Sequence, residues 1–174
     1  MSLLNISLIG LNSKPHYILG NIFTADEVKK LRIHIKILYL MYGTLANQSA
    51  ARGIIFSGHC RICSGQWEDI CHILTECDAT RSAREAMLPK ISELLTIAEP
   101  SLDWVTLSSN NMLLNQFLVD PCSANLQNNY RLPINNPHLH ELISLTRELC
   151  FRAHNLRTKA LSAAKVKCAS FVTT

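Results

Sequence analysis

The sequence is poor in aromatic and charged residues. Aromatic side chains make up 6% of its 174 residues and charged side chains 17%. So little charge argues against a disordered chain, and so few aromatics leave few platforms on which single-stranded bases could stack. No apolar run reaches the roughly eighteen residues of a membrane span, and no Gly-rich phosphate-binding loop is present. We therefore expect neither a membrane protein nor a P-loop enzyme.

The chain does contain enough apolar residues for one core. Hydrophobic residues make up 48% of the sequence, which suits a single domain, or one core with a small part held by a metal. The formal charge of +4 and the pI near 8.7 favour a weakly anionic partner. They fall short of the dense basic character of dedicated nucleic-acid binders. Charge alone does not decide the function.

Four residues in the middle of the chain follow a metal-ligand spacing. Cys60, Cys63, His72 and Cys77 form the pattern C-x2-C-x8-H-x4-C. Three thiolates and one imidazole are ligands of closed, tetrahedral Zn²⁺ sites, which have no open position for a reactive water. We therefore predict a structural zinc site. Such a site carries a net charge of about −1. Arg61, which lies between the first two ligands, could partly offset this charge.

The seven cysteines also bear on the compartment. Seven is an odd number, and three of these cysteines follow metal spacing together with His72 rather than a disulfide framework, which favours a reducing environment. We expect an intracellular protein without disulfides, and the sequence does not distinguish cytoplasm from nucleus.

The spacing predicts a helix break inside the motif. Residues 68–74 are typical of a short helix with two acidic residues in its first turn. Five residues of an α-helix rotate by about 140°, so His72 and Cys77 cannot share one face of an unbroken helix. We expect the backbone to open around residues 75–76.

Two other interpretations of these cysteines remain open. They could be free, partly buried thiols, or Cys60 and Cys63 could form a redox pair. Neither interpretation explains the other two residues of the motif. His59 and Cys71 lie beside the motif and could replace one of its ligands.

The first half of the chain predicts one helix before the motif. Residues 1–23 are rich in turn formers and are typical of an irregular segment. Thr24 begins a capping box with Glu27, and a helix is expected from there to Gly43. Residues 31–37 also alternate as a strand would, but the length and the cap favour the helix. Its apolar stripe is predicted to consist of Val28, Leu31, Ile35, Leu38 and Tyr42.

The second half predicts further helices around one loop. The helical region is expected to extend over residues 24–119, with the metal motif at 60–77 and a short apolar helix at 111–119. A surface loop follows at 120–137, and a long C-terminal helix at 138–168 packs on the same core, with the first helix as its natural partner. The fold class is mostly α: a small helical domain with a zinc-knuckle-like loop.

Two groups of basic residues are candidates for contact with phosphates. Lys29, Arg32 and Lys36 share the polar side of the first helix, and Arg81 and Arg84 lie on the helix that follows the motif. Such a face is most often only a solvated surface. Where it contacts nucleic acid, we expect weak sequence preference and strong salt dependence.

Taken together, these stretches resemble the region downstream of the polymerase in polyproteins of non-LTR (LINE-type) retrotransposons. The most specific part is similar to the reverse-transcriptase zinc-binding segment of that family, and it comprises Cys60-x2-Cys63, Glu68-Asp69, His72-Ile-Leu74, Cys77, and the helix with Arg81 and Arg84. Weaker similarity covers Ala25–Lys29, Tyr42–Thr44, Asn115–Asp120 and Leu145–Arg152. Family members often have proline where this chain has Arg61.

The resemblance implies a part that binds rather than one that catalyses. The Tyr-x-Asp-Asp carboxylates of the polymerase are missing, so two-metal phosphoryl transfer has no ligands here. The expected function is that of a non-catalytic, zinc-stabilised helical module that assists RNA or DNA binding, next to the reverse transcriptase domain of the same polyprotein. The alternative is a zinc-stabilised structural or protein-interaction module without nucleic-acid binding.

Overall fold

The computed structural model is built of helices. It describes residues 24–39, 41–44, 46–47, 58–63, 66–122, 124 and 132–170. The α-helices in this part of the chain are α1 (Ala25–Leu38), α3 (Arg81–Ala98), α4 (Trp104–Ser109), α5 (Asn111–Val119) and α6 (Leu139–Ser170). A π-helix (His72–Glu76) and a 3₁₀ turn (Asp78–Thr80) precede α3. Within these residues no strand occurs, only an isolated bridge, so the mostly α prediction is confirmed.

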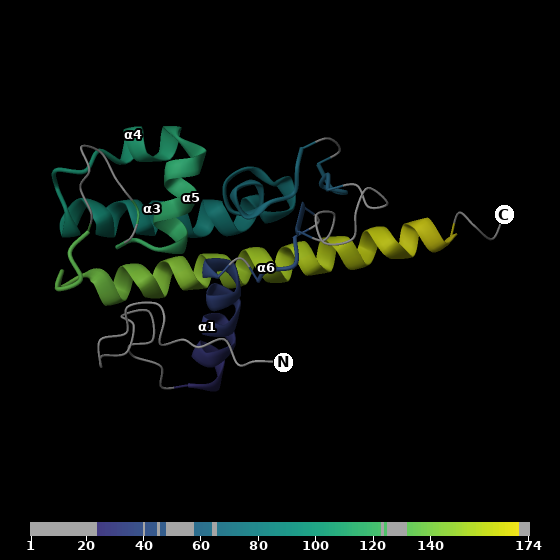
Figure 1. The fold of residues 1–174 in the computed structure, drawn as a ribbon, viewed down its shortest axis with the longest axis horizontal. Coiled ribbons are helices and arrows are strands. Elements are labelled where there is room, and N and C mark those ends of the chain that lie inside the picture. The colour runs from purple at the N-terminus through teal and green to yellow at the C-terminus, as the bar shows by residue number, and fades with distance from the viewer. Residues whose placement is uncertain are drawn as a thin grey trace.

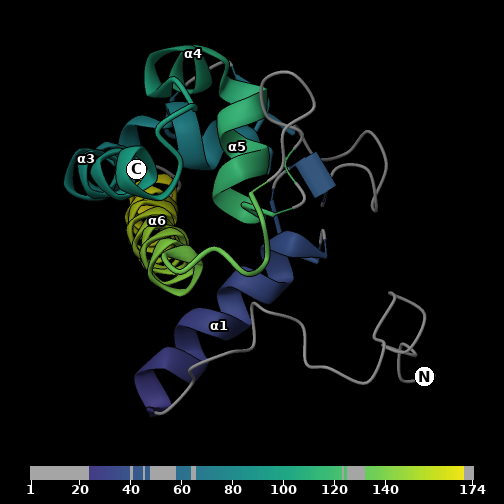
Figure 2. The same ribbon diagram turned by 90° about the vertical axis from the view of Figure 1, so that its left-hand side faces the viewer.

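Helix α6 runs through the middle of the molecule. Helix α3 lies along one side of it and α1 crosses another side (Figures 1 and 2). These are the two helices with which α6 makes its most extensive contacts. The predicted packing of α6 on α1 is therefore observed, and α3 is its second partner.

The core between α3, α5 and α6 is apolar. Ala83 of α3 and Ala153 of α6 are both buried, and such small side chains allow two helices to approach closely. Burying each larger apolar side chain contributes about 1.5–3 kcal/mol. Side chains with at most 1% exposure include Ile91, Leu95, Phe117, Leu118, Leu142 and Leu149.

The predicted apolar stripe of α6 is buried over only part of its length. Leu142, Leu149 and Ala153 are buried, Ala160 is half-buried, and Ala163 is exposed. The C-terminal end of α6 projects past the other labelled helices (Figure 1). The stripe therefore packs as expected only where α1 and α3 lie alongside it.

Helix α1 begins as predicted and ends earlier. The Thr24 side chain accepts from the Glu27 N–H at 3.2 Å, and the Glu27 carboxylate accepts from the Thr24 N–H at 2.9 Å. The helix ends at Leu38 rather than near Gly43. The reason is that the chain turns so that Tyr42 is buried, with its hydroxyl 2.8 Å from His154 Nδ1 on α6.

The buried face of α1 agrees only in part with the predicted stripe. Leu31 and Tyr42 are buried as predicted, whereas Val28 is 46% exposed. Ile33, His34 and Ile37, outside the predicted stripe, are buried as well. His34 is buried because its Nε2 lies 2.7 Å from the Val119 carbonyl oxygen at the end of α5. This contact rotates the helix relative to the expected stripe.

Two further predicted helices lie close to their predicted boundaries. The short apolar helix at 111–119 is confirmed as α5 (Asn111–Val119), and the long helix expected at 138–168 is α6 (Leu139–Ser170). Of the loop predicted at 120–137, residues 123 and 125–131 lie outside the described residues, as does the segment at 1–23. Among the described helices, none combines the length and apolar composition needed to cross a membrane.

Candidate metal centre

The fold brings the four residues of the predicted motif together. One ligand atom from each of Cys60, Cys63, His72 and Cys77 lies within 4.8 Å of all the others. Cys60, His72 and Cys77 are buried, and Cys63 is half-buried. The structure therefore shows a Cys3His cluster that is close enough to hold a metal ion. We call the segment from Cys60 to Cys77 the metal clip.

The spacing of the sulfur atoms suits a tetrahedral ion. With metal–sulfur bonds of about 2.3 Å, two sulfur atoms at neighbouring corners of a tetrahedron are about 3.8 Å apart. The Sγ of Cys77 lies 3.9 Å from that of Cys60 and 3.5 Å from that of Cys63. These two sulfur–sulfur distances are therefore close to those of a tetrahedral metal–thiolate shell.

A narrow hairpin carries the first two ligands. Its two sides are joined by hydrogen bonds from Cys60 N–H to the Gln66 carbonyl (2.7 Å) and from Glu68 N–H to the Gly58 carbonyl (2.8 Å). A side chain at Gly58 would collide with the Trp67 ring, since a Cβ atom there would lie 2.5 Å from it. Glycine at this position is what lets Trp67 cover the hairpin.

Backbone N–H groups face the sulfur atoms of this hairpin. Those of Ile62 and Cys63 point to the Cys60 sulfur, where they oppose the rise in its pKa that burial causes. The Asp78 N–H donates to Cys63 Sγ at 3.3 Å. Such N–H groups stabilise the thiolate form, which is the form that binds a metal.

The predicted helix break takes the form of a widened helix turn. The Asp69 side chain accepts from the His72 N–H at 2.8 Å and begins the turn. The Cys77 N–H then donates to the His72 carbonyl at 2.8 Å, five residues back. A π-helix stacks residue i+5 over residue i, so it places both ligands on one side. The backbone becomes extended at Cys77, directly after the predicted position.

Two side chains close the end of the clip. Thr80 Oγ1 donates to the carbonyls of Ile73 (2.6 Å) and Cys77 (3.0 Å). Arg84 Nη1 donates to the same Cys77 carbonyl at 2.8 Å, and Nη2 to the Glu76 carbonyl at 3.1 Å. These bonds satisfy carbonyls that the helix break leaves without partners. Arg84 thereby becomes part of the clip.

The position of Arg84 changes the expected charge balance. Burial lowers its pKa, and the nearby Cys77 sulfur opposes that effect. Arg84 is therefore placed to offset the negative charge of three thiolates. The sequence assigned this role to Arg61, which is exposed.

Burial disfavours the thiolate form of Cys77 unless a cation takes the place of its proton. Burial raises the pKa of Cys77 to about 12, although the Ala79 N–H lowers it. Metal binding must displace this proton, because only thiolates ligate. A thiol with so high a pKa is a poor nucleophile at neutral pH.

A buried ion pair joins the clip to α6. Arg157 Nη2 lies 2.5 Å from Glu68 Oε1, and both side chains are less than 9% exposed. The same nitrogen donates to the Gly43 carbonyl at 3.2 Å, and the guanidinium lies over the Tyr42 ring. Glu68 was expected in the first turn of a short helix. It instead fixes the hairpin to the long helix.

The neighbouring residues that could have replaced a ligand lie outside the cluster. The Cys71 sulfur faces the Asn111 carbonyl at 3.4 Å. The His59 ring packs edge-on against Trp67 with centroids 5.3 Å apart. The four residues of the motif therefore form the cluster without them.

The structure separates the five predicted phosphate contacts. Lys29, Arg32 and Lys36 are all exposed on α1. Arg81 is exposed at the start of α3, where it pairs with Asp78 at 2.5 Å. Arg84 is half-buried in the clip, as described above, so the two arginines do not form one open basic face.

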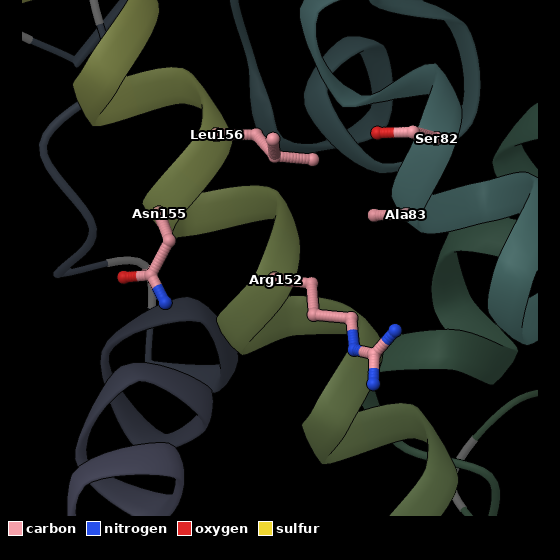
Figure 3. A pocket seen from close by; sticks show the side chains of 5 residues that line it. All are labelled: Ser82, Ala83, Arg152, Asn155 and Leu156. Atoms are coloured by element: carbon pink, nitrogen blue, oxygen red, sulfur yellow. The ribbon is translucent and has the colours of Figure 1, made fainter.

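A groove lies between the start of α3 and α6. Its volume is about 450 Å³, and Figure 3 shows its lining, which comprises Ser82, Ala83, Arg152, Asn155 and Leu156. The Nε of Arg152 donates to Glu148 Oε1 at 2.6 Å. The Arg152 guanidinium that lines this groove is thus already paired within α6, and the groove adds little to a phosphate-binding surface.

Comparisons with known proteins leave the metal clip as the main guide to function. No family model, curated protein or solved structure gives a significant match to this chain. Function is therefore inferred from the chemistry of the site.

Proposed function

We propose that this chain is a non-catalytic, zinc-stabilised helical module that contacts RNA or DNA, as expected of the region beside a retrotransposon reverse transcriptase. The observation that carries the proposal is the closed Cys3His cluster. All four of its members converge on one point, so a bound ion has no protein-defined open position for a substrate. Its role is to hold the fold.

The donor set favours zinc over other ions. Three soft sulfur ligands and one imidazole suit Zn²⁺ in tetrahedral geometry, whereas magnesium and calcium prefer oxygen ligands. The sulfur spacing given above agrees with zinc–thiolate bond lengths. Bound zinc would order the hairpin, the π-helix and the start of α3 together.

The nucleic-acid contact is assigned to α1. Lys29, Arg32 and Lys36 are exposed at positions i, i+3 and i+7, which share one face of a helix. None of the three makes an ion pair with the residues described here. Three free cations in a row can neutralise successive phosphates without reading bases.

Salt-dependent RNA binding tests this assignment. We expect the zinc-loaded chain to bind labelled single-stranded RNA, with affinity falling as salt rises by a log–log slope of about −2 for three phosphate contacts. Lys29→Glu with Arg32→Glu should abolish binding and leave the metal content unchanged. The charge-matched control is Lys90→Glu with Lys159→Glu, at exposed positions on α3 and α6. Equal losses in both double variants would contradict a site on α1.

A second candidate function is a structural or protein-interaction module without nucleic-acid binding. The observation that favours it is the use of Arg84 and Arg157 inside the structure, where both hold carbonyl groups or a carboxylate. Basic side chains that make these internal contacts are not available to bind phosphates. Absence of RNA and DNA binding at low salt by a zinc-loaded, folded chain would favour this candidate.

A further inference from the structure

The imidazole of His72 has different surroundings at its two nitrogen atoms. Nδ1 lies 3.5 Å from Glu76 Oε2, and Nε2 is buried with no hydrogen-bond partner among the described residues. A buried polar nitrogen without a partner is costly. The orphaned nitrogen belongs to a residue of the Cys3His cluster, so a cation in the cluster would supply its missing partner.

The carboxylate of Glu76 is itself held in place from another helix. Asn111, the first residue of α5, donates from Nδ2 to Glu76 Oε1 at 2.6 Å. One oxygen of Glu76 thus faces the imidazole, and the other is held by a residue 35 positions further along the chain. An ordinary surface pair of residues four apart has no such third member.

We propose that Glu76, held by Asn111, is a positioning residue that keeps His72 in the tautomer with its proton on Nδ1 and its lone pair on Nε2, ready to bind the metal. This inference rests on the proposed metal site. In metal centres the histidine ligand commonly donates its other N–H to a carboxylate, which fixes the ring and raises its basicity. Glu76 supplies that carboxylate from within the π-helix.

One turn of π-helix positions both the Cys77 ligand and the Glu76 carboxylate. It brings Cys77 to the same side as His72, and it leaves Glu76, one residue before Cys77, beside the outer edge of the imidazole. Through Asn111 the clip is also bound to α5, whose contacts with the π-helix are among those that hold the clip on the core. Metal binding and the docking of α5 are thus connected through one carboxylate.

The tautomer can be observed directly. Long-range ¹⁵N–¹H NMR of the zinc-loaded full chain distinguishes a metal-bound nitrogen from a protonated one. We expect zinc at Nε2 and a proton at Nδ1 of His72 in the wild type. Zinc at Nδ1 would overturn the proposal, since that nitrogen would then be unable to donate to Glu76.

Affinity measurements test the role of the carboxylate. In competition with a chelator, Glu76→Gln should weaken zinc binding by about tenfold or more, and Asn111→Ala by a smaller factor. Combining the two should cost no more than Glu76→Gln alone, because Asn111 acts through Glu76. Glu85→Gln on the exposed side of α3 is the matched control for the lost charge. Circular dichroism of the metal-saturated variants checks that each is folded.

The outcomes separate this inference from the metal site itself. If Glu76→Gln binds zinc as tightly as Glu85→Gln, the positioning role is wrong and the metal site stands. If the wild-type chain binds no zinc, both are wrong.

Discussion

The metal clip and the core between α3 and α6 both contain fully buried side chains but are stabilised in different ways. Leu142 and Leu149 of the core are 0% exposed, and Cys60 and Cys77 of the clip are 2% and 1% exposed. These core side chains are apolar and pack against apolar neighbours. The buried ligand groups of the clip are sulfur atoms and an imidazole that converge on one another.

This difference predicts which part of the fold would depend on a metal ion. Apolar packing is a property of the chain alone, whereas a converging set of thiols gains its free energy from the ion that replaces their protons. Stability should therefore be unequal along the chain, with the clip dependent on metal and the centres of α3 and α6 much less so. Three perturbations test this contrast.

Metal removal should have the largest effect, and it should be local. Treating the zinc-loaded chain with a chelator is expected to raise amide exchange by orders of magnitude in residues 58–63 and 66–80, because the free energy of structural zinc binding is about 10 kcal/mol or more. Exchange near Ile91 and Leu149 should change far less. Hydrogen exchange by mass spectrometry measures both regions at once. An equal loss of exchange protection in the clip and in the core, or no loss in either, would contradict the expected difference between the two regions.

Breaking the ion pair between the clip and α6 should have the second-largest effect on stability. Glu68→Ala leaves the Arg157 guanidinium buried without its carboxylate, and such losses cost about 3–5 kcal/mol of unfolding free energy. Urea denaturation of the zinc-loaded chain measures the loss. Glu85→Ala on the exposed side of α3 is the control and should change stability by less than about 0.5 kcal/mol. A similar small change in both variants would show that the pair does not join the two regions.

Truncation within the core should have a slightly smaller effect that does not depend on the metal. Leu149 is fully buried on α6, and Leu149→Ala is expected to lower the unfolding free energy by about 2–5 kcal/mol. The lost exchange protection near Ile91 should be the same with and without chelator. A loss seen only in the zinc-loaded chain would mean that core packing itself depends on the clip.

The sequence predicted the metal clip well because its chemistry is local. All four residues fall between Cys60 and Cys77, and the rotation of a helix dictates that His72 and Cys77 need a break between them. Glu76 could have been noticed from its spacing of four residues from His72. Asn111 carries no such signal, since only the docking of α5 brings it to the clip.

The sequence could not predict the contacts that join distant parts of the chain. Glu68 and Arg157 are 89 positions apart, and no periodicity relates them. The predicted buried face of α1 was wrong in part for the same reason, because His34 faces inward, where it meets the Val119 carbonyl. Arg84 was predicted as a surface cation because nothing local marks the carbonyls that it binds.

The metal content of the purified full chain tests the central claim most directly. Elemental analysis of the wild type and of Cys77→Ser, prepared side by side, should give one zinc ion per wild-type chain, with the cluster thiols reacting with a thiol reagent only after chelation. Cys77→Ser should hold much less zinc and lose the protection of Cys60 and Cys63. A wild-type chain without stoichiometric metal, or a variant that retains as much zinc as the wild type, would contradict the account.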